Sequence, residues 1–390
     1  MADEVRFRRL REAMQRERLD ALVCRLPEHV LMLSGYRPLA AWVYAVFPRE
    51  GPGACLLPDT EEEEARAELF ETGCLTYPFG TKDSPPQQES LLRLLQPLAR
   101  GWKRVGWEAG SEVSAPAWNT AELQLPSARS RALLERAFGG RRLVDASALL
   151  RAEQVVKTPA EIQGVRTACR IANLGIEEFF RRVQPGAGGV ELAAAVEAAV
   201  MGRGTGVEGA RRVRGFAQVA VGPESARGWR PSEVTTARRL ARGEIALLEL
   251  AVVADGFWCD RTRARAAGEA TPEQREAHAV VARAQAAAIA AVRPGAGGAE
   301  VDEAARRVVR EAGRDRQFMH VTGHGLGYRY HEYAPMLAPR SRDVLQAGMI
   351  HSVEPGVYDP GFGGIRIEDD VLVTEAGAEV LGPAPSGLDG

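Results

Sequence analysis

The chain lacks long hydrophobic runs, carries little net charge and contains few cysteines, and each shortage excludes a class of protein. No window approaches about 18 consecutive apolar residues, so we expect no membrane-spanning helix. The N-terminus is charged from its first residues and lacks the apolar core of a signal peptide. Fifty basic and 52 acidic residues leave a net charge of −2, which does not favour nucleic acid or an anionic membrane as a partner. We therefore expect a cytoplasmic protein.

The cysteine pattern argues against a disulfide framework. The five cysteines are odd in number, scattered, and never spaced as C-x-x-C: Cys24, Cys55, Cys74, Cys169 and Cys259. Several lie in apolar runs, which favours a role as small core residues over disulfides or zinc ligands.

Composition and element order indicate two domains. With 390 residues, 45% of them hydrophobic and 26% charged, the chain has the size for two cores and the composition of a globular protein. Helical and strand-like segments alternate up to about residue 150, which predicts an α/β domain over residues 1–153. Thr158 as N-cap and Pro159 at the first helical position then predict a long helix at 160–182, within a second domain at 154–390.

The first domain yields several local predictions. The acidic run Glu61–Glu64 follows the capping pair Asp59-Thr60, so we interpret it as a solvated first helical turn and not as a metal site. The expected elements are a helix at 4–18, a strand at 21–24, a turn at 26–28, strands at 42–47 and 54–57, and a helix at 61–70. We group the apolar segment at 30–33 with the strand candidates.

A ten-residue pattern occurs twice in the second half. Residues 183–192 (VQPGAGGVEL) return as residues 292–301 (VRPGAGGAEV), each time between an Ala-rich helix and another helix. Two copies are too few for a solenoid, so they predict a domain of two similar α/β halves with a site in the cleft between them. The G-x-G-x-x-G at 204–209 follows a helix instead of a strand, so we interpret it as a loop and not as a nucleotide-binding motif.

Residues that can bind metal are concentrated in three segments, the first of which predicts a β-hairpin. A strand at 245–253, a turn at Asp255-Gly256 and a returning strand from residue 257 bring Glu249 and Asp260 side by side on one face. Two facing carboxylates repel each other unless a cation or a proton lies between them.

The second and third segments add a histidine and two further acids. Four of the six histidines lie between residues 320 and 351, and the glycines around His324 let the backbone approach closely and turn the imidazole into a cleft. Glu354 ends an apolar strand before a Pro-Gly turn, and Glu368 lies inside a strand pattern at 365–373, where a buried acid needs a partner. Four carboxylates and one imidazole suit Mn²⁺, Fe²⁺, Co²⁺ or Zn²⁺, and bridging carboxylates suit a pair of ions.

Three ordered motifs resemble the pita-bread metallopeptidases: G-H-G-x-G-x-x-x-H-E at 323–332, S-V-E-P-G-x-Y at 352–358 and G-G-x-R-x-E-D at 363–369. This superfamily includes Xaa-Pro aminopeptidases, prolidases, methionine aminopeptidases and creatinase. Residues 5–36 resemble the creatinase-type N-terminal domain that methionine aminopeptidases lack, which favours the Xaa-Pro peptidase branch. The resemblance implies an α/β creatinase-like N-terminal domain and an α+β pita-bread C-terminal domain with an internal pseudo-two-fold repeat.

The resemblance also implies the roles of particular residues. Asp260 and Glu368 match bridging carboxylates, and Glu354 matches a ligand that also acts as general base on a metal-bridging water. The positions of the family's five metal ligands hold Glu249, Asp260, His324, Glu354 and Glu368.

Three further residues and the partners follow from the same resemblance. His331 and His320 match substrate-facing histidines, of which one near the scissile carbonyl stabilises the oxyanion, and Arg366 matches an arginine beside the site. The implied cofactors are two divalent ions (Mn²⁺, Zn²⁺ or Co²⁺). The implied substrate is a proline-containing peptide cleaved at an Xaa-Pro bond, and the implied assembly is a homodimer.

Two positions depart from the family pattern. The first ligand is normally Asp, in the form D-x₁₀-D, whereas this chain keeps the spacing but has Glu249. The extra methylene moves the carboxylate outward by about 1.5 Å, so the backbone or rotamer must adapt or one ion is weakened. The family also places a histidine upstream of the first ligand, where this chain has Trp229.

These departures leave three functional hypotheses. The first is a dinuclear metallopeptidase that cleaves Xaa-Pro bonds, and the intact Asp260, His324, Glu354 and Glu368 favour it. The second is a related hydrolase with one metal or none, acting on a small amide or amidine. The third is a homologue that has lost catalysis and binds peptides or partners.

Overall fold

A computed structural model describes residues 4–39, 42–80, 84–99, 101–111, 126–139, 142–230 and 235–389. The chain divides into two compact units, Met1–Gln154 and Val155–Gly390. Among the described residues, no helix combines the length and the apolar character needed to cross a membrane.

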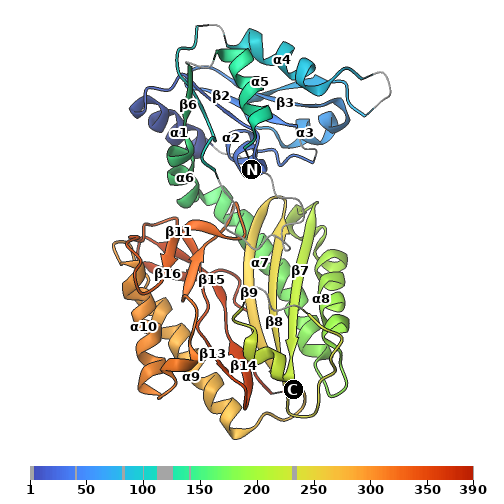
Figure 1. Cartoon of the computed structure of the whole chain (residues 1–390), viewed down its shortest axis with the longest axis vertical. Coiled ribbons are helices and arrows are strands. Elements are labelled where there is room, and N and C mark those ends of the chain that lie inside the picture. Colours follow the sequence, from blue (N-terminus) through green and yellow to red (C-terminus); the bar gives the residue numbers. More distant parts are fainter. Residues whose placement is uncertain are drawn as a thin grey trace. The chain divides into compact units, whose positions relative to one another are not determined.

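A six-stranded mixed sheet forms the centre of the N-terminal unit (Figure 1). Its strand order is β4-β3-β2-β1-β5-β6, with antiparallel pairs at β1–β2 and β2–β3 and parallel pairs elsewhere. This mixture of helices and strands is the α/β domain that the sequence predicts. The strands are β1 Ala21–Cys24, β2 Tyr44–Pro48, β3 Gly53–Pro58, β4 Thr72–Tyr77, β5 Val105–Trp107 and β6 Leu143–Asp145. The helices are α1 Glu4–Arg16, α2 Pro27–Ser34, α3 Glu62–Glu68, α4 Gln87–Leu98, α5 Ala128–Phe138 and α6 Ser147–Val155.

The apolar segment at 30–33 is helical, so its grouping with the strands is wrong. It lies within α2, which has Pro27 in its first turn and ends at Gly35, whose φ is +82°. The N–H of Gly35 donates to the carbonyl of Leu31 and closes the last turn. Proline at the start and glycine at the end of a segment both indicate a helix. The four-residue apolar run is too short to show helical or strand periodicity, so these two signals decide the structure.

The acidic run at 61–64 is only partly a solvated face. Glu61 is 3% exposed and ends a short 3₁₀ turn before α3. Its Oε2 accepts hydrogen bonds from the hydroxyl of Tyr36 and from the N–H of Leu39, the latter at 2.9 Å. Asp59 does not cap α3 but accepts the N–H of Phe79 at 3.1 Å. The prediction of a cap and of solvation is therefore wrong for these two acids.

The C-terminal unit consists of two similar halves, as the internal repeat predicts (Figure 1). In the first half, helices α7 and α8 accompany the sheet β7-β8-β9, and in the second half α9 and α10 accompany the sheet β11-β10-β12-β15-β16. Strands β13 and β14 form a separate pair. The helices are α7 Pro159–Arg182, α8 Gly189–Gly204, α9 Pro272–Ala291 and α10 Gly298–Glu311. The strands are β7 Val213–Val221, β8 Ile245–Ala254, β9 Phe257–Ala266, β10 Gly323–Gly325, β11 Glu332–Leu337, β12 Ile350–Val353, β13 Gly356–Asp359, β14 Gly363–Arg366, β15 Asp369–Thr374 and β16 Gly377–Val380.

The two copies of the repeat perform the same structural task. Each forms the turn between its half's two helices, and in each the glutamate three residues after a glycine N-cap accepts that glycine's N–H. Glu191 and Glu300 make these bonds to Gly188 and Gly297 at 3.3 and 3.4 Å. The long helix predicted at 160–182 is α7, and Thr158 caps it as expected.

Candidate metal centre

The hairpin of β8 and β9 brings the first two predicted ligands onto one face. Its turn is Asp255-Gly256, with φ of +47° and +95°, which matches the strand twist of a two-residue hairpin. Asp260 pairs with Ala251, and Glu249 lies two residues before Ala251. Since side chains alternate along a strand, Glu249 and Asp260 lie on the same face, but diagonally and not directly opposite each other.

His324 lies on β10 between two neighbouring strands, and the Nε2 atom of its imidazole faces two carboxylates. A Cβ on Gly325 would lie 2.1 Å from the carbonyl oxygen of Ala334, so only glycine allows this approach beside His324. The imidazole Nδ1 bonds the carbonyl of Gly325 at 3.0 Å and must therefore carry the hydrogen. Its Nε2 lies 3.4 Å from Oδ2 of Asp260 and 3.6 Å from Oε1 of Glu354.

Glu354, which is partly buried, and Glu368, which is fully buried, complete a convergent group of four residues. Potential ligand atoms of His324, Glu354 and Glu368 lie within 4.8 Å of one another. Glu354 follows β12 as predicted, whereas Glu368 is not inside a continuous strand. It lies in the break between β14 and β15 and bridges to Thr262 on β9, which corrects the strand pattern expected at 365–373. At this break, the backbone of Glu368 in the second half of the unit pairs with that of Thr262 in the β8–β9 hairpin.

Two buried carboxylate oxygens in this group have no hydrogen-bond partner among the described residues. They are Oδ1 of Asp260 and Oε1 of Glu368, whose side chains are 2% and 1% exposed. The other oxygen of Glu368 accepts a hydrogen bond from the hydroxyl of Thr262 at 2.5 Å. A buried, unpaired carboxylate oxygen is costly unless a cation binds it, so this donor set fits divalent ions.

Raised pKa values within this group also reflect the crowding of several acids in one buried place. Burial and the charges of Asp260 and Glu354 raise the pKa of Glu368 well above its ordinary value. Burial raises the pKa of Glu354 to about 7. Burial lowers the pKa of His324, but its hydrogen bond to Asp260 and the charge of Glu354 outweigh this and raise it to about 9. Without metal, protons therefore take the place of cations in this cluster.

Glu249, the fifth predicted ligand, has other partners. Its Oε2 lies 2.5 Å from Nη2 of Arg366, and its Oε1 accepts the hydroxyl hydrogen of Tyr330 at 2.7 Å. With 27% exposure, its side chain is more open than those of the other three acids and the histidine. It belongs to none of the convergent ligand groups found among the described residues.

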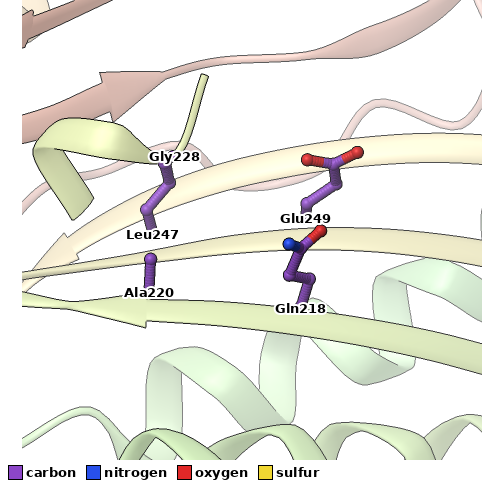
Figure 2. Close-up of a pocket in the computed structure, with 5 residues that line it drawn as sticks. All are labelled: Gln218, Ala220, Gly228, Leu247 and Glu249. Atoms are coloured by element: carbon purple, nitrogen blue, oxygen red, sulfur yellow. The ribbon is translucent and has the colours of Figure 1, made fainter. Parts of the chain in front are cut away.

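A small pocket lies beside Glu249. It is lined by Gln218, Ala220, Gly228, Leu247 and Glu249. Figure 2 shows Gln218 and Glu249 projecting from paired positions of β7 and β8 on the same side of the sheet. Trp229, at the position where the motif resemblance leads us to expect a histidine, follows Gly228 and packs against the core of the C-terminal unit.

The three remaining predicted residues lie close to this cluster. The ring of His331 lies tilted against that of His324 with 3.8 Å between ring centroids, and burial lowers the pKa of His331 to about 2. His320 lies 4.0 Å from Glu354, and burial lowers its pKa to about 3, so both imidazoles are neutral near pH 7. Arg366 is 5% exposed and reaches Glu249. All eight residues predicted for the site therefore lie in one region of the C-terminal unit.

Sequence reasoning missed two tyrosines in this region. Tyr330 donates to Glu249 at 2.7 Å. The hydroxyl of Tyr358 lies 2.9 Å from Nε2 of His320 and accepts from Nη1 of Arg366 at 3.1 Å. Both occur inside the quoted motifs, so their positions were visible, but a motif does not show what a hydroxyl contacts.

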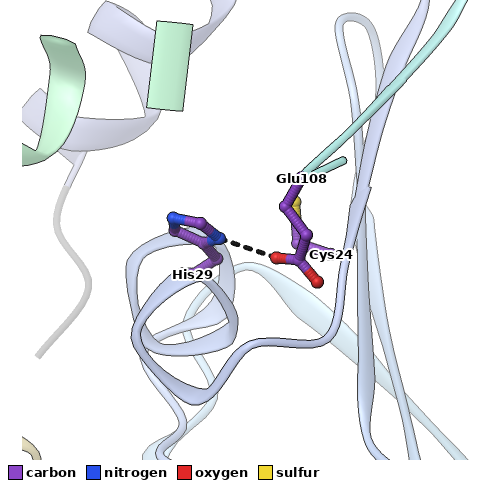
Figure 3. Close-up of side chains that lie close together, drawn as sticks. All are labelled: Cys24, His29 and Glu108. Atoms are coloured by element: carbon purple, nitrogen blue, oxygen red, sulfur yellow. Dashed lines mark hydrogen bonds and ion pairs between the residues drawn. The ribbon is translucent and has the colours of Figure 1, made fainter. Parts of the chain in front are cut away.

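A second group of potential ligands, in the N-terminal unit, is already satisfied. Figure 3 shows Cys24, His29 and Glu108, whose ligand atoms lie within 4.8 Å of one another. One oxygen of Glu108 accepts the N–H groups of Arg25 and Leu26 at 2.7 and 3.0 Å, and the other lies 2.6 Å from His29. Burial raises the pKa of the Cys24 thiol well above its ordinary value. Glu108 thus anchors the start of α2, which agrees with a packing role for the cysteine.

Comparison with known families identifies the class of this protein. Residues 163–375 match metallopeptidase family M24, and residues 6–153 match the creatinase/prolidase N-terminal domain. The chain belongs to metallopeptidase family M24. This finding confirms the resemblance and the fold class expected from the motifs.

Individual relatives and solved structures agree with this assignment. The putative dipeptidase YkvY of Bacillus subtilis is 32% identical over 255 residues, 65% of this chain and 68% of the relative. The Xaa-Pro dipeptidase of Pyrococcus furiosus is 34% identical over 228 residues, 58% of this chain and 63% of the relative. The solved prolidase of Pyrococcus horikoshii matches with a TM-score of 0.79 at 26% identity, covering 99% of this chain and all of that one (100%).

Proposed function

We propose that this chain is a metal-dependent peptidase that cleaves Xaa-Pro bonds, with two divalent ions (Mn²⁺, Zn²⁺ or Co²⁺) in the cluster around His324. The observation that carries the proposal is the pair of buried, unpartnered oxygens on Asp260 and Glu368 beside His324 and Glu354. A site that only stabilised the fold would pair these oxygens with N–H or O–H donors. The names of relatives, a Xaa-Pro dipeptidase and a prolidase, support the choice of bond.

The predicted ligands differ in how many of their ligand atoms already have other partners. Asp260 and Glu368, which match bridging carboxylates of the family, would hold the ions with oxygens that have no hydrogen-bond partner among the described residues, and His324 would offer its Nε2. Glu249 would be the fifth ligand, in place of its contacts with Arg366 and Tyr330. Bound divalent ions supply Lewis-acid polarisation of the scissile carbonyl and lower the pKa of a water molecule.

The remaining chemistry belongs to side chains of this protein. Glu354 accepts the proton of the attacking water, and its position 3.6 Å from Nε2 of His324 in the cluster supports this role. His331 and His320 are neutral imidazoles beside the cluster and not cations. Nδ1 of His320 carries its hydrogen toward the carbonyl of Val321 at 2.8 Å, so the hydrogen-bond donor toward the substrate carbonyl is assigned to His331. Arg366 orients Glu249 and the hydroxyl of Tyr358 beside the site.

Other features stay predictions of the family resemblance. These are the homodimer, the cytoplasmic location and the domain limits at 1–153 and 154–390. Size-exclusion chromatography with light scattering checks the first of them, because a dimer has twice the 42.2 kDa mass of this chain.

The function is tested with purified full-length protein loaded with Mn²⁺, Zn²⁺ or Co²⁺. We expect hydrolysis of an Ala-Pro dipeptide or an Ala-Pro-Ala tripeptide, and none of Ala-Ala. Cleavage of the dipeptide alone indicates a prolidase, and cleavage of the tripeptide alone an aminopeptidase P. Turnover of small amides or amidines instead, or peptide binding without cleavage, would contradict the proposal in favour of the two other hypotheses.

A further inference from the structure

A buried cluster of two thiols and a carboxylate lies on the face of β9 that points away from the predicted metal ligands. Cys259 directly precedes Asp260 on β9, and because side chains alternate along a strand, the two point to opposite faces. Cys169 on α7 and Asp370 on β15 meet Cys259 there, with one ligand atom from each of the three lying within 4.8 Å of the others. All three side chains are buried. A packing role predicts buried cysteines, but it does not require two thiols to meet.

The two sulfurs are placed to form a bond with each other. Cys259 donates a hydrogen bond to the sulfur of Cys169, so the thiols already face each other. A disulfide requires the sulfurs to approach to about 2 Å, and rotation about the Cα–Cβ bonds can close a separation of less than 4.8 Å. The bond would join α7 to β9, two elements that are packed together already.

A buried cation favours thiol chemistry over metal binding in this cluster. The guanidinium of Arg261 is fully buried, and its charge acts on both Cys169 and Asp370. Burial raises the pKa of Cys169, but the hydrogen bond from Cys259 and the charge of Arg261 outweigh burial and lower this pKa below its ordinary value. The thiolate is the form of cysteine that attacks an oxidant. A soft metal ion would have to share the buried space with an arginine that already supplies the positive charge.

A coil covers Cys169. The C-terminal segment at 381–389 contains no helix or strand, and Gly382 passes directly over the cysteine, because a Cβ built on Gly382 would lie 3.3 Å from Cβ of Cys169. Gly382 is half-buried, and Pro383 after it is exposed. Local opening of a coil costs less than opening of a core strand or helix. A molecule close to water in size, such as hydrogen peroxide, can therefore reach the thiol.

Asp370 connects the thiols to the candidate metal centre. Its Oδ2 lies 3.3 Å from the sulfur of Cys169, and its two oxygens accept the N–H of Asp260 at 3.2 and 3.4 Å. One buried carboxylate thus contacts both a thiol and the backbone of a predicted ligand. When a disulfide draws the sulfur of Cys169 toward Cys259, Asp370 loses this partner and the support behind Asp260 changes.

We propose that Cys169 and Cys259 form a reversible disulfide when the protein meets hydrogen peroxide, and that this bond weakens metal binding at Asp260. Cys169 attacks one oxygen of the peroxide and becomes a sulfenic acid, while the other oxygen leaves as water with the thiol proton. The sulfur of Cys259 then displaces the hydroxyl of the sulfenic acid, which leaves as a second water with the proton of Cys259. The two sulfurs are oxidised and one peroxide is reduced. The effect on metal binding rests on the proposed function, whereas the disulfide does not.

The test treats the chelator-stripped full chain with hydrogen peroxide, removes the peroxide by desalting and alkylates the remaining thiols after denaturation. Peptide mass mapping without reduction should show Cys169 joined to Cys259 with the loss of two hydrogens, and the other three of the five cysteines alkylated. Dithiothreitol should restore all five thiols.

Equilibrium dialysis of the desalted, undenatured protein gives the second readout. The oxidised protein should bind Mn²⁺ about tenfold more weakly than the reduced protein, because loss of a group that supports a metal ligand from behind costs about 10–100-fold in metal affinity. Reduction by dithiothreitol should restore the affinity.

Three variants separate the thiol pair from other effects of peroxide. Cys169→Ser keeps a hydroxyl beside Asp370 but cannot form the disulfide, so peroxide should leave its Mn²⁺ affinity unchanged, and Cys259→Ser should behave in the same way. Cys74→Ser is the matched control, because Cys74 pairs with Cys55 on the neighbouring strand and provides the alternative pair of thiols. This variant should still form the Cys169–Cys259 bond and lose affinity as the wild type does.

The outcomes separate this inference from the proposed function. It is overturned if Cys169 and Cys259 both stay alkylated after peroxide treatment, or if the only disulfide joins Cys55 to Cys74. A Cys169–Cys259 disulfide that leaves the Mn²⁺ affinity unchanged, or an equal loss of affinity in Cys169→Ser, also overturns it. If the reduced wild-type chain binds no Mn²⁺, Zn²⁺ or Co²⁺, the proposed function fails instead, and the peptide map still decides whether the disulfide forms.

Discussion

The Nζ atom of Lys157 lies 2.5 Å from Oε2 of Glu332, and the two side chains are 0% and 3% exposed. The second oxygen of Glu332 accepts the N–H of Tyr328 at 2.9 Å. One carboxylate thus ties the segment that carries His331 to the residue just before the N-cap of α7. The buried ion pair is therefore a structural support of the candidate site within the C-terminal unit.

Lys157→Met should destabilise the protein strongly. The substitution leaves the Glu332 carboxylate buried without its counterion, which typically costs about 3–5 kcal/mol in the free energy of unfolding. Urea unfolding followed by circular dichroism measures the loss. Arg293→Met is the control, since it removes the pair with Glu300 whose side chains are 55% and 49% exposed, and the midpoint should barely move. Equal shifts in the two variants would contradict the role of the buried pair.

Gly325→Ala should disturb the strand that carries His324. An added Cβ would lie 2.1 Å from the backbone oxygen of Ala334, so the strands must separate at a cost of about 1–3 kcal/mol or more. We expect a lower melting temperature and weaker Mn²⁺ binding. Gly297→Ala serves as the comparison because nothing lies within 4 Å of the added Cβ. If both glycine variants have the melting temperature of the wild type, the close packing around His324 is not required for stability.

Glu354→Gln should abolish most of the turnover without unfolding the protein. The amide cannot accept the proton of the attacking water, and loss of a general base costs about 10²–10⁴ in rate. The rate of Ala-Pro hydrolysis and the circular dichroism spectrum are the two readouts. Glu375→Gln, at an exposed position, should keep full activity. Retained activity in Glu354→Gln would refute its role as base.

Asp369 should make stability depend on pH in the acid range. Burial raises its pKa, but the charges of Arg261 and Arg263 outweigh burial and hold the pKa below 3.8. Because the folded pKa is depressed, the stabilisation is present above the unfolded value and is lost as pH falls through the folded one. Asp369→Asn should therefore be less stable than wild type in urea at neutral pH, with the difference narrowing as the pH falls below the ordinary aspartate pKa of about 3.9. A difference that stays constant would argue against this linkage.

The sequence was most informative where one short motif defines both a backbone shape and a chemical group. His324 lies between glycines that admit neighbouring strands, and Glu354 precedes a Pro-Gly turn, so local pattern and tertiary position agree. The hairpin of Glu249 and Asp260 was predictable because a two-residue Asp-Gly turn sets the register of both strands.

The sequence was least informative where a contact joins distant segments. Glu249 is on β8, whereas its partners Tyr330 and Arg366 follow about 80 and 117 positions later in the chain. No local pattern indicates that these three side chains meet. The prediction that the acidic run at 61–64 is solvated failed for the same reason, because Glu61 is buried and bonded to Tyr36, which is distant in the chain.

Metal-dependent cleavage of Xaa-Pro bonds is tested most directly by the rate of Ala-Pro hydrolysis by one preparation before chelation, after chelation and after Mn²⁺ is restored. Turnover should disappear with the metal and return with it, and Ala-Ala should not be cleaved in any state. Hydrolysis that persists unchanged after complete metal removal, or no hydrolysis of Ala-Pro or Ala-Pro-Ala with Mn²⁺, Zn²⁺ or Co²⁺ bound, would contradict it.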